Sequence, residues 1–133
     1  MRQYIAALNA RDPDTIGSLL AENCRFVDST GGWVEGRDNT MAATRAFLDF
    51  ETNFRINEED IVLRGDNVLV RGSTSAQNPQ LAKDKLWRAK VQGGKLALWQ
   101  SYGTESLPLA RILMPDAART SVKANAALSP DEA

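Results

Sequence analysis

A run of closely spaced strand-like segments fills most of the second half of the chain and constrains the fold more than any other feature. Four such segments cover residues 53–63, 67–77, 83–92 and 95–104. The breaks between them are Arg64-Gly-Asp-Asn67, Asn78-Pro79 and Gly93-Gly94, and the last is typical of a tight hairpin turn. Because consecutive strands on short connections pair antiparallel, the run predicts an antiparallel sheet.

The first fifty residues predict three helices and one short strand. An apolar face over 4–8 predicts the first helix, and Asp12 before a proline predicts the start of a second over 13–22. Residues 25–28 read as a strand, and 38–50 as the third helix. Helices followed by strands indicate an α+β domain, with the helices packed on one face of a curved, mainly antiparallel sheet.

Composition excludes several classes of function. The 133 residues, enough for one core, include 16 basic and 17 acidic residues, a net charge of −1, so neither nucleic acid nor a membrane surface is an expected partner. There is no histidine and one cysteine, Cys24, which argues against zinc sites and against Ser-His or Cys-His catalysis. No segment approaches the ~20 apolar residues of a membrane span, so a cytoplasmic protein without metal or cofactor is expected.

The end of the chain differs in composition from the rest. Pro108 and Pro115 interrupt it, and residues 116–133 are rich in alanine, serine and asparagine. We therefore expect a domain over 1–107 and a tail over 108–133 that is disordered or partly helical, with 117–128 as the candidate helix.

Four local motifs resemble the nuclear transport factor 2-like superfamily, which includes SnoaL-like proteins and ketosteroid isomerase. They are Tyr4-Ile-x-x-Leu8 with Arg11-Asp-Pro-Asp-Thr-Ile16, then Leu20-Ala-Glu-Asn-Cys-Arg-Phe-Val-Asp28, Val34-Glu-Gly-Arg-Asp38, and Gly94-Lys-Leu-Ala-Leu-Trp-Gln-Ser-Tyr102. The resemblance covers residues 1 to about 107 and implies a cone-shaped α+β barrel. It does not fix the activity, because this fold carries many.

The ketosteroid isomerase pattern implies catalytic roles for two residues. Tyr4 falls on the tyrosine that binds the oxyanion, and Asp28 falls on the aspartate that carries the proton. The second oxyanion acid falls on Leu86, so that donor is missing; Asp84, two residues away on the same strand face, substitutes only if the register slips by two. Without the resemblance, Asp28 reads as a turn-capping carboxylate and Tyr4 as a core residue.

The same register predicts the walls of a ligand cavity. Its expected members, beside the two catalytic candidates, are Phe26, Trp33, Asp84, Leu86, Arg88, Trp99 and Ser101. Each has a plainer alternative: Arg88 as a salt-bridge partner of Asp84, Trp99 as ordinary core, and Trp33 as a loop anchor rather than a lid.

Two functions therefore stay open at this point. One is an isomerase or cyclase that moves a proton on a small apolar carbonyl compound; the other is a non-catalytic ligand-binding or dimerisation module. Alternation turns Trp87, Leu98 and Tyr102 to the outer face, along with Leu96, which predicts a homodimer through that face. The alternative cover for the face is the tail, through its apolar residues 112–114.

Overall fold

The computed structural model of the chain describes residues 1–103 and 108–120. The helices in this part are α1 (Arg2–Asn9), α2 (Pro13–Leu19), α3 (Arg37–Phe50) and α4 (Leu109–Leu113), with a short 3-10 turn, η1 (Pro79–Leu81). The strands are β1 (Leu20–Val27), β2 (Gly32–Glu35), β3 (Arg55–Arg64), β4 (Asn67–Ser75), β5 (Asp84–Gln92), β6 (Lys95–Tyr102) and β7 (Arg119–Thr120).

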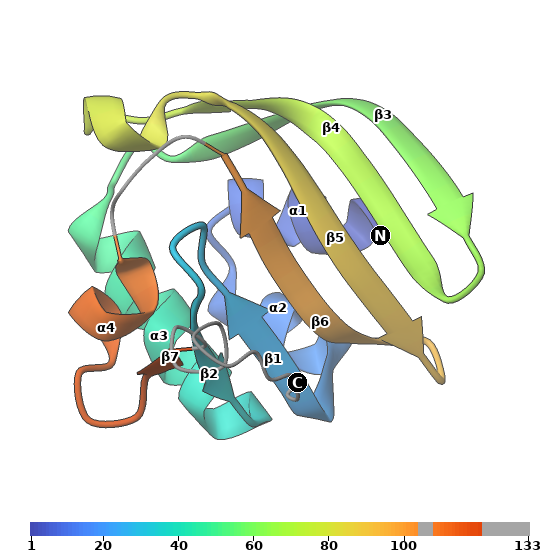
Figure 1. Ribbon diagram of the computed structural model, residues 1–133, viewed down its shortest axis with the longest axis horizontal. Coiled ribbons are helices and arrows are strands. Elements are labelled where there is room, and N and C mark those ends of the chain that lie inside the picture. The colour runs from blue at the N-terminus through green and yellow to red at the C-terminus, as the bar shows by residue number, and fades with distance from the viewer. Residues whose placement is uncertain (104–107, 121–133) are drawn as a thin grey trace.

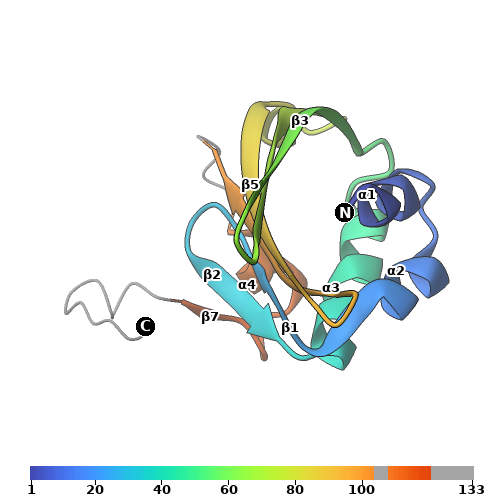
Figure 2. The same cartoon turned by 90° about the vertical axis from the view of Figure 1, so that its right-hand side faces the viewer.

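The strands form one curved sheet in the order β3-β4-β5-β6-β1-β2-β7 (Figure 1). All neighbours pair antiparallel except β1 and β6, which are parallel. The sheet curls, and α1, α2 and α3 lie along its concave side (Figure 2). This arrangement confirms the predicted α+β cone.

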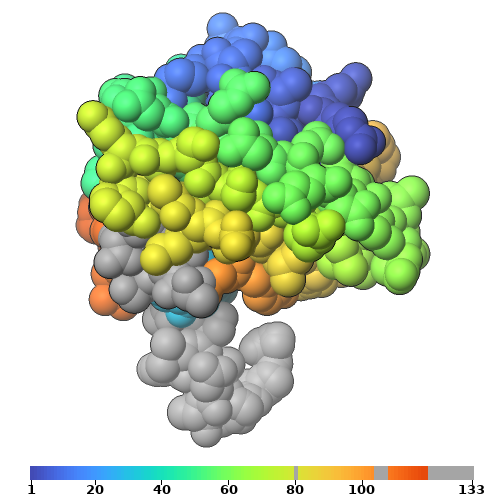
Figure 3. Space-filling model, turned by 90° about the horizontal axis from the view of Figure 1, so that it is seen from above, coloured from blue at the N-terminus to red at the C-terminus, as the bar shows by residue number. Residues whose placement is uncertain are grey.

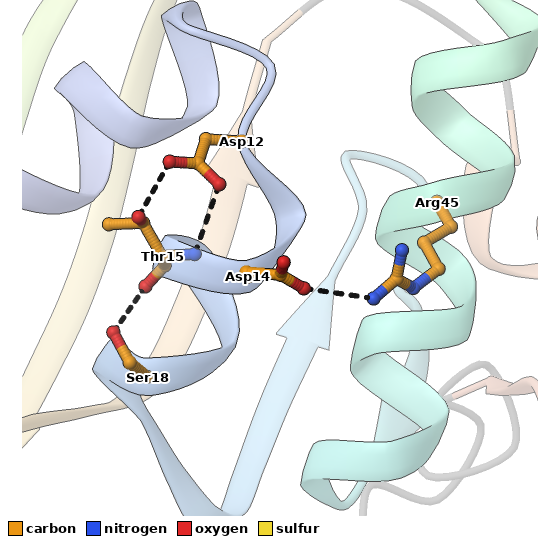
Figure 4. Close-up of polar contacts among 5 residues, drawn as sticks. All are labelled: Asp12, Asp14, Thr15, Ser18 and Arg45. Carbon is orange, nitrogen blue, oxygen red and sulfur yellow. Dashed lines mark hydrogen bonds and ion pairs between the residues drawn. The ribbon is translucent and has the colours of Figure 1, made fainter.

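The start of α2 forms as the sequence predicts. Asp12 caps the helix: its carboxylate accepts from the Thr15 amide at 3.3 Å and from the Thr15 hydroxyl at 2.6 Å, and the Ser18 hydroxyl donates to the Thr15 carbonyl (Figure 4). Asp14 faces Arg45 of α3 at 3.6 Å. The cap fixes the start of α2, and the exposed ion pair adds a weak link to α3.

The end of α2 and the length of β1 differ from the prediction. The helix stops at Leu19 rather than near Glu22, and the strand begins at Leu20 rather than at Arg25. Leu20 and Cys24 are buried against β6, with Leu20 opposite Leu96. This pairing joins strands far apart in the sequence, so residues 20–24 become strand although their local pattern fits a helix.

Polar side chains attach α1 to the sheet and the loop after α1 to the end of α3. The Asn9 amide side chain exchanges two hydrogen bonds with the backbone of Ile56, at 2.8 and 2.9 Å, as a neighbouring strand residue would. Arg11, at a positive φ of 57°, points its guanidinium at the last carbonyls of α3, Leu48 and Glu51. The helices are thus held at a fixed position over the concave face.

Glu51 joins three segments at the end of α3. Its buried carboxylate accepts from the backbone amides of Asn53, Gln77 and Asn78 at 2.9–3.0 Å. Burial by itself raises the pKa of the carboxyl, but these three donors and the nearby Arg11 outweigh burial and hold the pKa below its usual value. Glu51 therefore ties the loop between β4 and β5 to the helix layer.

A bulge in β6 corrects the predicted orientation of β5. Near the hairpin Gln92 pairs with Lys95 and Val91 with Leu96, but Lys90 pairs with Leu98, so Ala97 is an extra residue. Without it, Leu86 would lie opposite Ser101 and face the interior, as the sequence-based register has it. With the extra residue, the side chains of β5 from Lys90 toward the start of the strand point to the face opposite the predicted one.

The shift explains why several residues were predicted on the wrong face. Trp87 is 2% exposed and faces the interior, and Leu86 is 52% exposed on the outer face. Leu96 was also expected outside, but it is buried in the core because the bulge places it on the same side as Trp99. The expected dimer surface loses Trp87, and Leu98, also expected outside, is half-buried and lines the cavity described below. Tyr102 remains exposed, and the dimer stays a prediction.

Residues 108–120 pack at the β2 end of the sheet. Ala110 of α4 is buried with Val34 and Ala43, and Leu113, Met114 and Ala118 pack around them. In the view from above, β3–β5 form the green to yellow surface that faces the viewer (Figure 3). Residues 117–118 are not helical and 119–120 form β7; the rest of the predicted helix over 117–128 lies outside the described residues.

None of the helices within the described ranges has the length and apolarity required to cross a lipid bilayer.

Candidate ligand-binding cavity

A cavity with a volume of about 80 Å³ lies between the concave face of the sheet and the helices. Its wall is mostly apolar and draws on α1, α3, α4 and the strands β1, β3, β4, β5 and β6. The lining residues are Tyr4, Leu8, Leu20, Cys24, Arg25, Phe26, Thr40, Ala43, Thr44, Phe47, Phe54, Ile56, Thr74, Leu81, Lys85, Trp87, Leu96, Leu98, Trp99, Ser101, Leu109 and Leu113. A wall of this kind, apolar with a few polar groups, is typical of small-molecule sites.

Aromatic rings form one side of the cavity. Trp87 of β5 and Trp99 of β6 stack with centroids 5.6 Å apart and an angle of 20° between planes. Tyr4 of α1 tilts against Trp99 at 5.0 Å. Both tryptophans lie on the concave face because of the β6 bulge, so the bulge builds this wall.

The phenol of Tyr4 and the thiol of Cys24 are neutral at ordinary pH. Burial, and to a lesser extent the neighbouring Cys24, raises the pKa of Tyr4 well above its usual value. Burial also raises the pKa of the Cys24 thiol, and nearby Thr40 and Arg37 only partly oppose this. The two groups therefore present an O–H and an S–H to the cavity rather than anions.

Thr40, at the start of α3, carries a hydroxyl with unusual surroundings. Thr40 is 7% exposed, and within the described ranges its Oγ1 makes no hydrogen bond of normal geometry. The Cys24 thiol is close enough to interact with it weakly. A buried hydroxyl without a partner is uncommon and costs stability, and here the group belongs to the cavity wall.

Lys85 supplies a cation to the wall of the cavity. It is 8% exposed, on the same face of β5 as Trp87, and its Nζ donates to the Ser29 hydroxyl at 3.2 Å. Ser29 belongs to the turn after β1, and Ser101, which also lines the cavity, pairs with Trp87 across the sheet. The sequence-based register turned residue 85 to the outer face of the strand. In the structure Lys85 instead faces the cavity.

Asp28, expected to face the cavity as the base, is buried but is absent from the cavity wall. Its Oδ1 accepts from the amide and hydroxyl of Thr30 at 2.9 and 2.7 Å and from the Gly32 amide at 3.0 Å. Its Oδ2 accepts from the Ala110 amide at 2.8 Å. A Cβ on Gly32 would lie 2.9 Å from Oδ2, so the glycine makes room for the carboxylate. The carboxylate thus caps the turn after β1 and joins it to α4.

The other predicted site residues divide into two groups. Tyr4, Phe26, Trp99 and Ser101 line the cavity, as expected. Asp84, Leu86 and Arg88 lie elsewhere: Asp84 and Leu86 border a surface groove with Tyr102, and Arg88 donates to Asn67 and Gln100, each at 3.1 Å. Their placement in the cavity was wrong because of the one-residue shift described above.

Trp33 is also outside the cavity wall. It lies in β2, between β1 and β7 in the sheet, and the Arg25 guanidinium sits 3.9 Å from its ring centroid. Arg119 approaches the same ring at 5.8 Å. These contacts favour the anchor interpretation over the lid.

Sequence reasoning missed Lys85, Trp87, Cys24 and Thr40 as cavity residues. For β5 a signal was present: Trp87 and Ala89 alternate with the charged residues Arg88 and Lys90, so apolar alternation favours the face that the structure turns inward. For Thr40 the sequence holds no signal, because an exposed and a buried threonine look alike on a helix.

Comparison with known proteins places the chain among small cone-shaped domains. Residues 1–99 match the family of SnoaL-like domains. No functionally curated protein matches the chain. A protein with a ketosteroid isomerase-like fold from Catenulispora acidiphila, solved with trimethylamine, has a TM-score of 0.70 and 20% identity over 82% of this chain and 88% of its own.

Two further solved structures share the fold. A candidate polyketide cyclase from Sinorhizobium meliloti has a TM-score of 0.68 and 18% identity, covering 74% of this chain and 89% of its own. TerC, co-crystallised with polyporic acid, has a TM-score of 0.61 and 17% identity, covering 77% and 88%. At these identities the likeness shows the fold alone.

Proposed function

The chain belongs to the SnoaL-like domain family, and from this premise we propose that it binds a small, apolar, ring-containing molecule in the cavity without transforming it by carboxylate-driven proton transfer. The observation that carries the proposal is the stacked pair Trp87 and Trp99 on the cavity wall. Two indole faces with Tyr4 against one of them favour a flat ring over an irregular aliphatic chain.

The choice of binding over isomerisation rests on the polar groups of the wall. A base that removes a proton beside a carbonyl must reach the substrate directly or through one water. Asp28, the expected base, carries four hydrogen bonds from its own turn and from α4 and does not line the cavity. No aspartate or glutamate within the described residues lines it either.

Two of the solved structures support a binding role in a general way. The protein from Catenulispora acidiphila was solved with trimethylamine, and TerC with polyporic acid. Both share the fold described above, and each was solved together with a small molecule. The chemistry of the ligand of the present chain is argued from its own residues.

The test is binding of neutral aromatic compounds, para-cresol and methyl para-hydroxybenzoate, followed by nitrogen–proton correlation NMR. The indole N–H signals of Trp87 and Trp99 should shift on titration, whereas that of Trp33 should not, because Trp33 is outside the cavity wall. Trp33 is therefore an internal control. Equal shifts at all three tryptophans, or none up to millimolar compound, would overturn the proposal.

Two matched variants localise the binding. Trp99→Phe removes part of the aromatic wall and should weaken binding about tenfold, because a smaller ring buries less area and stacks less well. Trp33→Phe changes a tryptophan outside the cavity and should leave affinity unchanged. An unchanged affinity in Trp99→Phe would contradict the assignment of the site.

A further inference from the structure

Thr40 carries the polar group of the cavity wall that the fold leaves unmatched. The side chain is 7% exposed, its Oγ1 is shielded from solvent, and within the described ranges that oxygen makes no hydrogen bond of normal geometry. Thr74, equally buried in the same wall, shows the usual arrangement, because its hydroxyl bonds to the backbone of residues 81 and 83. A buried hydroxyl without a partner lowers the stability of a fold, so Thr40 points to a hydrogen bond that an occupant of the cavity supplies.

Thr40 can turn its hydroxyl toward such an occupant at little cost. It lies near the start of α3, and Ala43, Thr44 and Phe47 of the same helix continue the cavity wall. Rotation about χ1 exchanges the hydroxyl and the methyl group of a threonine, and helical threonines populate two of these rotamers. The Oγ1 gives up no normal hydrogen bond in turning, so the rotation costs little beyond the weak contact with the Cys24 thiol.

The corner of the cavity around Thr40 is polar but uncharged. Cys24, which interacts with both Thr40 and Tyr4, belongs to the same wall as these two residues, and burial keeps its thiol and the Tyr4 phenol protonated. The Tyr4 ring lies against Trp99, so this corner adjoins the aromatic wall. An oxygen placed here meets hydroxyl and thiol groups rather than a charged side chain.

The two cationic residues of the wall are engaged within the chain. The Arg25 guanidinium bonds to Glu35 at 3.2 Å and lies over the Trp33 ring. The Lys85 ammonium donates to the Ser29 hydroxyl at 3.2 Å and has a further interaction besides. A carboxylate entering the cavity would therefore lose its hydration without an unengaged cation to receive it, and burying an unpaired charge costs far more than burying a hydroxyl.

We infer that Thr40 selects the ligand by binding an uncharged oxygen on its ring, a hydroxyl or a carbonyl, while the ring lies against Trp87 and Trp99. The inference deepens the proposed function and rests on it. The chemical class is that of phenols and of aryl ketones and esters, not of aryl carboxylates. A threonine hydroxyl both donates and accepts, so it pairs with either kind of oxygen. An analogue without the oxygen leaves the Thr40 hydroxyl unpaired, and the site discriminates against that analogue for this reason.

The experiment is a cycle that makes the same exchange of groups on the ligand and on the protein. Para-cresol carries a hydroxyl where para-xylene carries a methyl group, and Thr40→Val replaces the hydroxyl of the wall by a methyl group. The preference for cresol over xylene, measured from the indole N–H signals of Trp87 and Trp99, should be about tenfold greater in the wild type than in Thr40→Val. Part of this difference should come from tighter binding of xylene by the variant.

Two further variants control the cycle. Thr40→Ser keeps the hydroxyl and should keep the preference for cresol, which separates loss of the hydroxyl from a change of shape. Thr52→Val makes the same exchange at an exposed position after α3, outside the cavity wall, and should keep the wild-type preference. A preference that falls with Tyr4→Phe but not with Thr40→Val would overturn the assignment to Thr40.

A comparison in the wild type alone tests the charge of the ligand. Para-hydroxybenzoate carries a carboxylate at neutral pH and its methyl ester does not, so the ester should bind about tenfold more tightly. Equal or tighter binding of the acid would show that the cavity accepts an anion, and the proposed class would be wrong.

The outcomes separate this inference from the proposed function. If cresol and xylene both shift Trp87 and Trp99, and the ratio of their affinities is the same in the wild type and in Thr40→Val, the role of Thr40 is wrong and the aromatic site stands. If no probe shifts these tryptophans, both fail. Thr40→Ala, which also lacks the hydroxyl, completes the cycle where Thr40→Val does not fold.

Discussion

Buried polar groups in two regions of this molecule differ in how fully the fold itself satisfies them. Asp28 and Glu51, at the ends of β1 and α3, accept four and three hydrogen bonds respectively. In the cavity, the Thr40 hydroxyl has no partner of normal geometry within the described residues. A buried carboxylate is tolerated only when donors surround it, so the first region is built for stability. The second region leaves hydrogen-bonding capacity for a ligand.

The difference explains why a buried aspartate at the family's catalytic position need not be a base. The isomerase pattern implies a carboxylate that is open to substrate, whereas Asp28 is enclosed by Thr30, Gly32 and Ala110. These partners belong to the turn after β1, to β2 and to α4. The residue type matches the pattern, but its surroundings give it the role of a cap.

The largest expected effect comes from Asp28→Asn. The amide keeps one acceptor but turns an NH₂ toward groups that donate, so the free energy of unfolding should fall by about 2–4 kcal/mol. Chemical denaturation measures this, with the exposed Asp49→Asn of α3 as the control that should change little. Full stability in Asp28→Asn would break the comparison and return Asp28 to the list of candidate bases.

Glu51→Gln should have the next largest effect, and it depends on pH. The variant loses an acceptor for backbone amides, so unfolding should cost about 1–3 kcal/mol less near neutral pH. Because the folded-state pKa of Glu51 lies below its ordinary value of 4.5, its contribution is present above that value and is lost as pH falls through the folded pKa. The difference between wild type and variant should therefore shrink on acidification.

The pH dependence is checked by urea denaturation at a series of pH values between about 6 and 3. Glu22→Gln, an exposed carboxylate on β1, serves as the control and should follow the wild-type curve. A difference that grows on acidification would mean that the hydrogen bonds to Glu51 do not favour its charged form.

A matched pair of threonines sharpens the comparison within the cavity itself. Thr40 and Thr74 are equally buried, at 7%, and both line the cavity. Thr74 accepts from the Lys83 amide at 3.1 Å and donates to backbone carbonyls of residues 81 and 83, whereas the Thr40 hydroxyl has no such partner among the described residues. Thr74→Val should lower the free energy of unfolding by about 1–2 kcal/mol, and Thr40→Val should leave it unchanged or raise it by up to about 1 kcal/mol.

Thermal unfolding of the two valine variants without ligand measures this contrast. Equal destabilisation by both would show that the Thr40 hydroxyl is hydrogen-bonded in solution, and the contrast between the two regions would then fail. Opposite signs would show that the chain retains a hydroxyl that costs stability.

The smallest expected effect concerns assembly through the outer face. If the predicted homodimer forms there, Leu86→Arg should shift sedimentation toward the monomer, since Leu86 and Tyr102 are exposed on neighbouring strands. Leu63→Arg, an exposed leucine near the far end of β3, should not. A wild type that sediments as a monomer at micromolar concentration would refute the dimer.

The sequence determined the order of α1 to α3 and of the strands β1 and β3 to β6, because its signals for them are local, whereas β2, α4 and β7 were not predicted from it. Asp12 and Pro13 begin α2, Gly93-Gly94 closes the hairpin between β5 and β6, and the spacing of turns gives the four strands of the second half. The motifs that carry the family resemblance also lie within short segments. Such features depend on neighbouring residues, so they are legible before the chain folds.

Only the tertiary structure decided which side chains meet in the cavity. The extra residue Ala97 reverses β5, and the parallel pairing of β1 with β6 extends β1 back to Leu20. Both depend on contacts between strands rather than on local preference, and a shift of one residue exchanges the two faces of a strand. For the same reason Leu86 and Arg88 were predicted from the sequence to line the cavity, whereas in the folded sheet Lys85 and Trp87 line it.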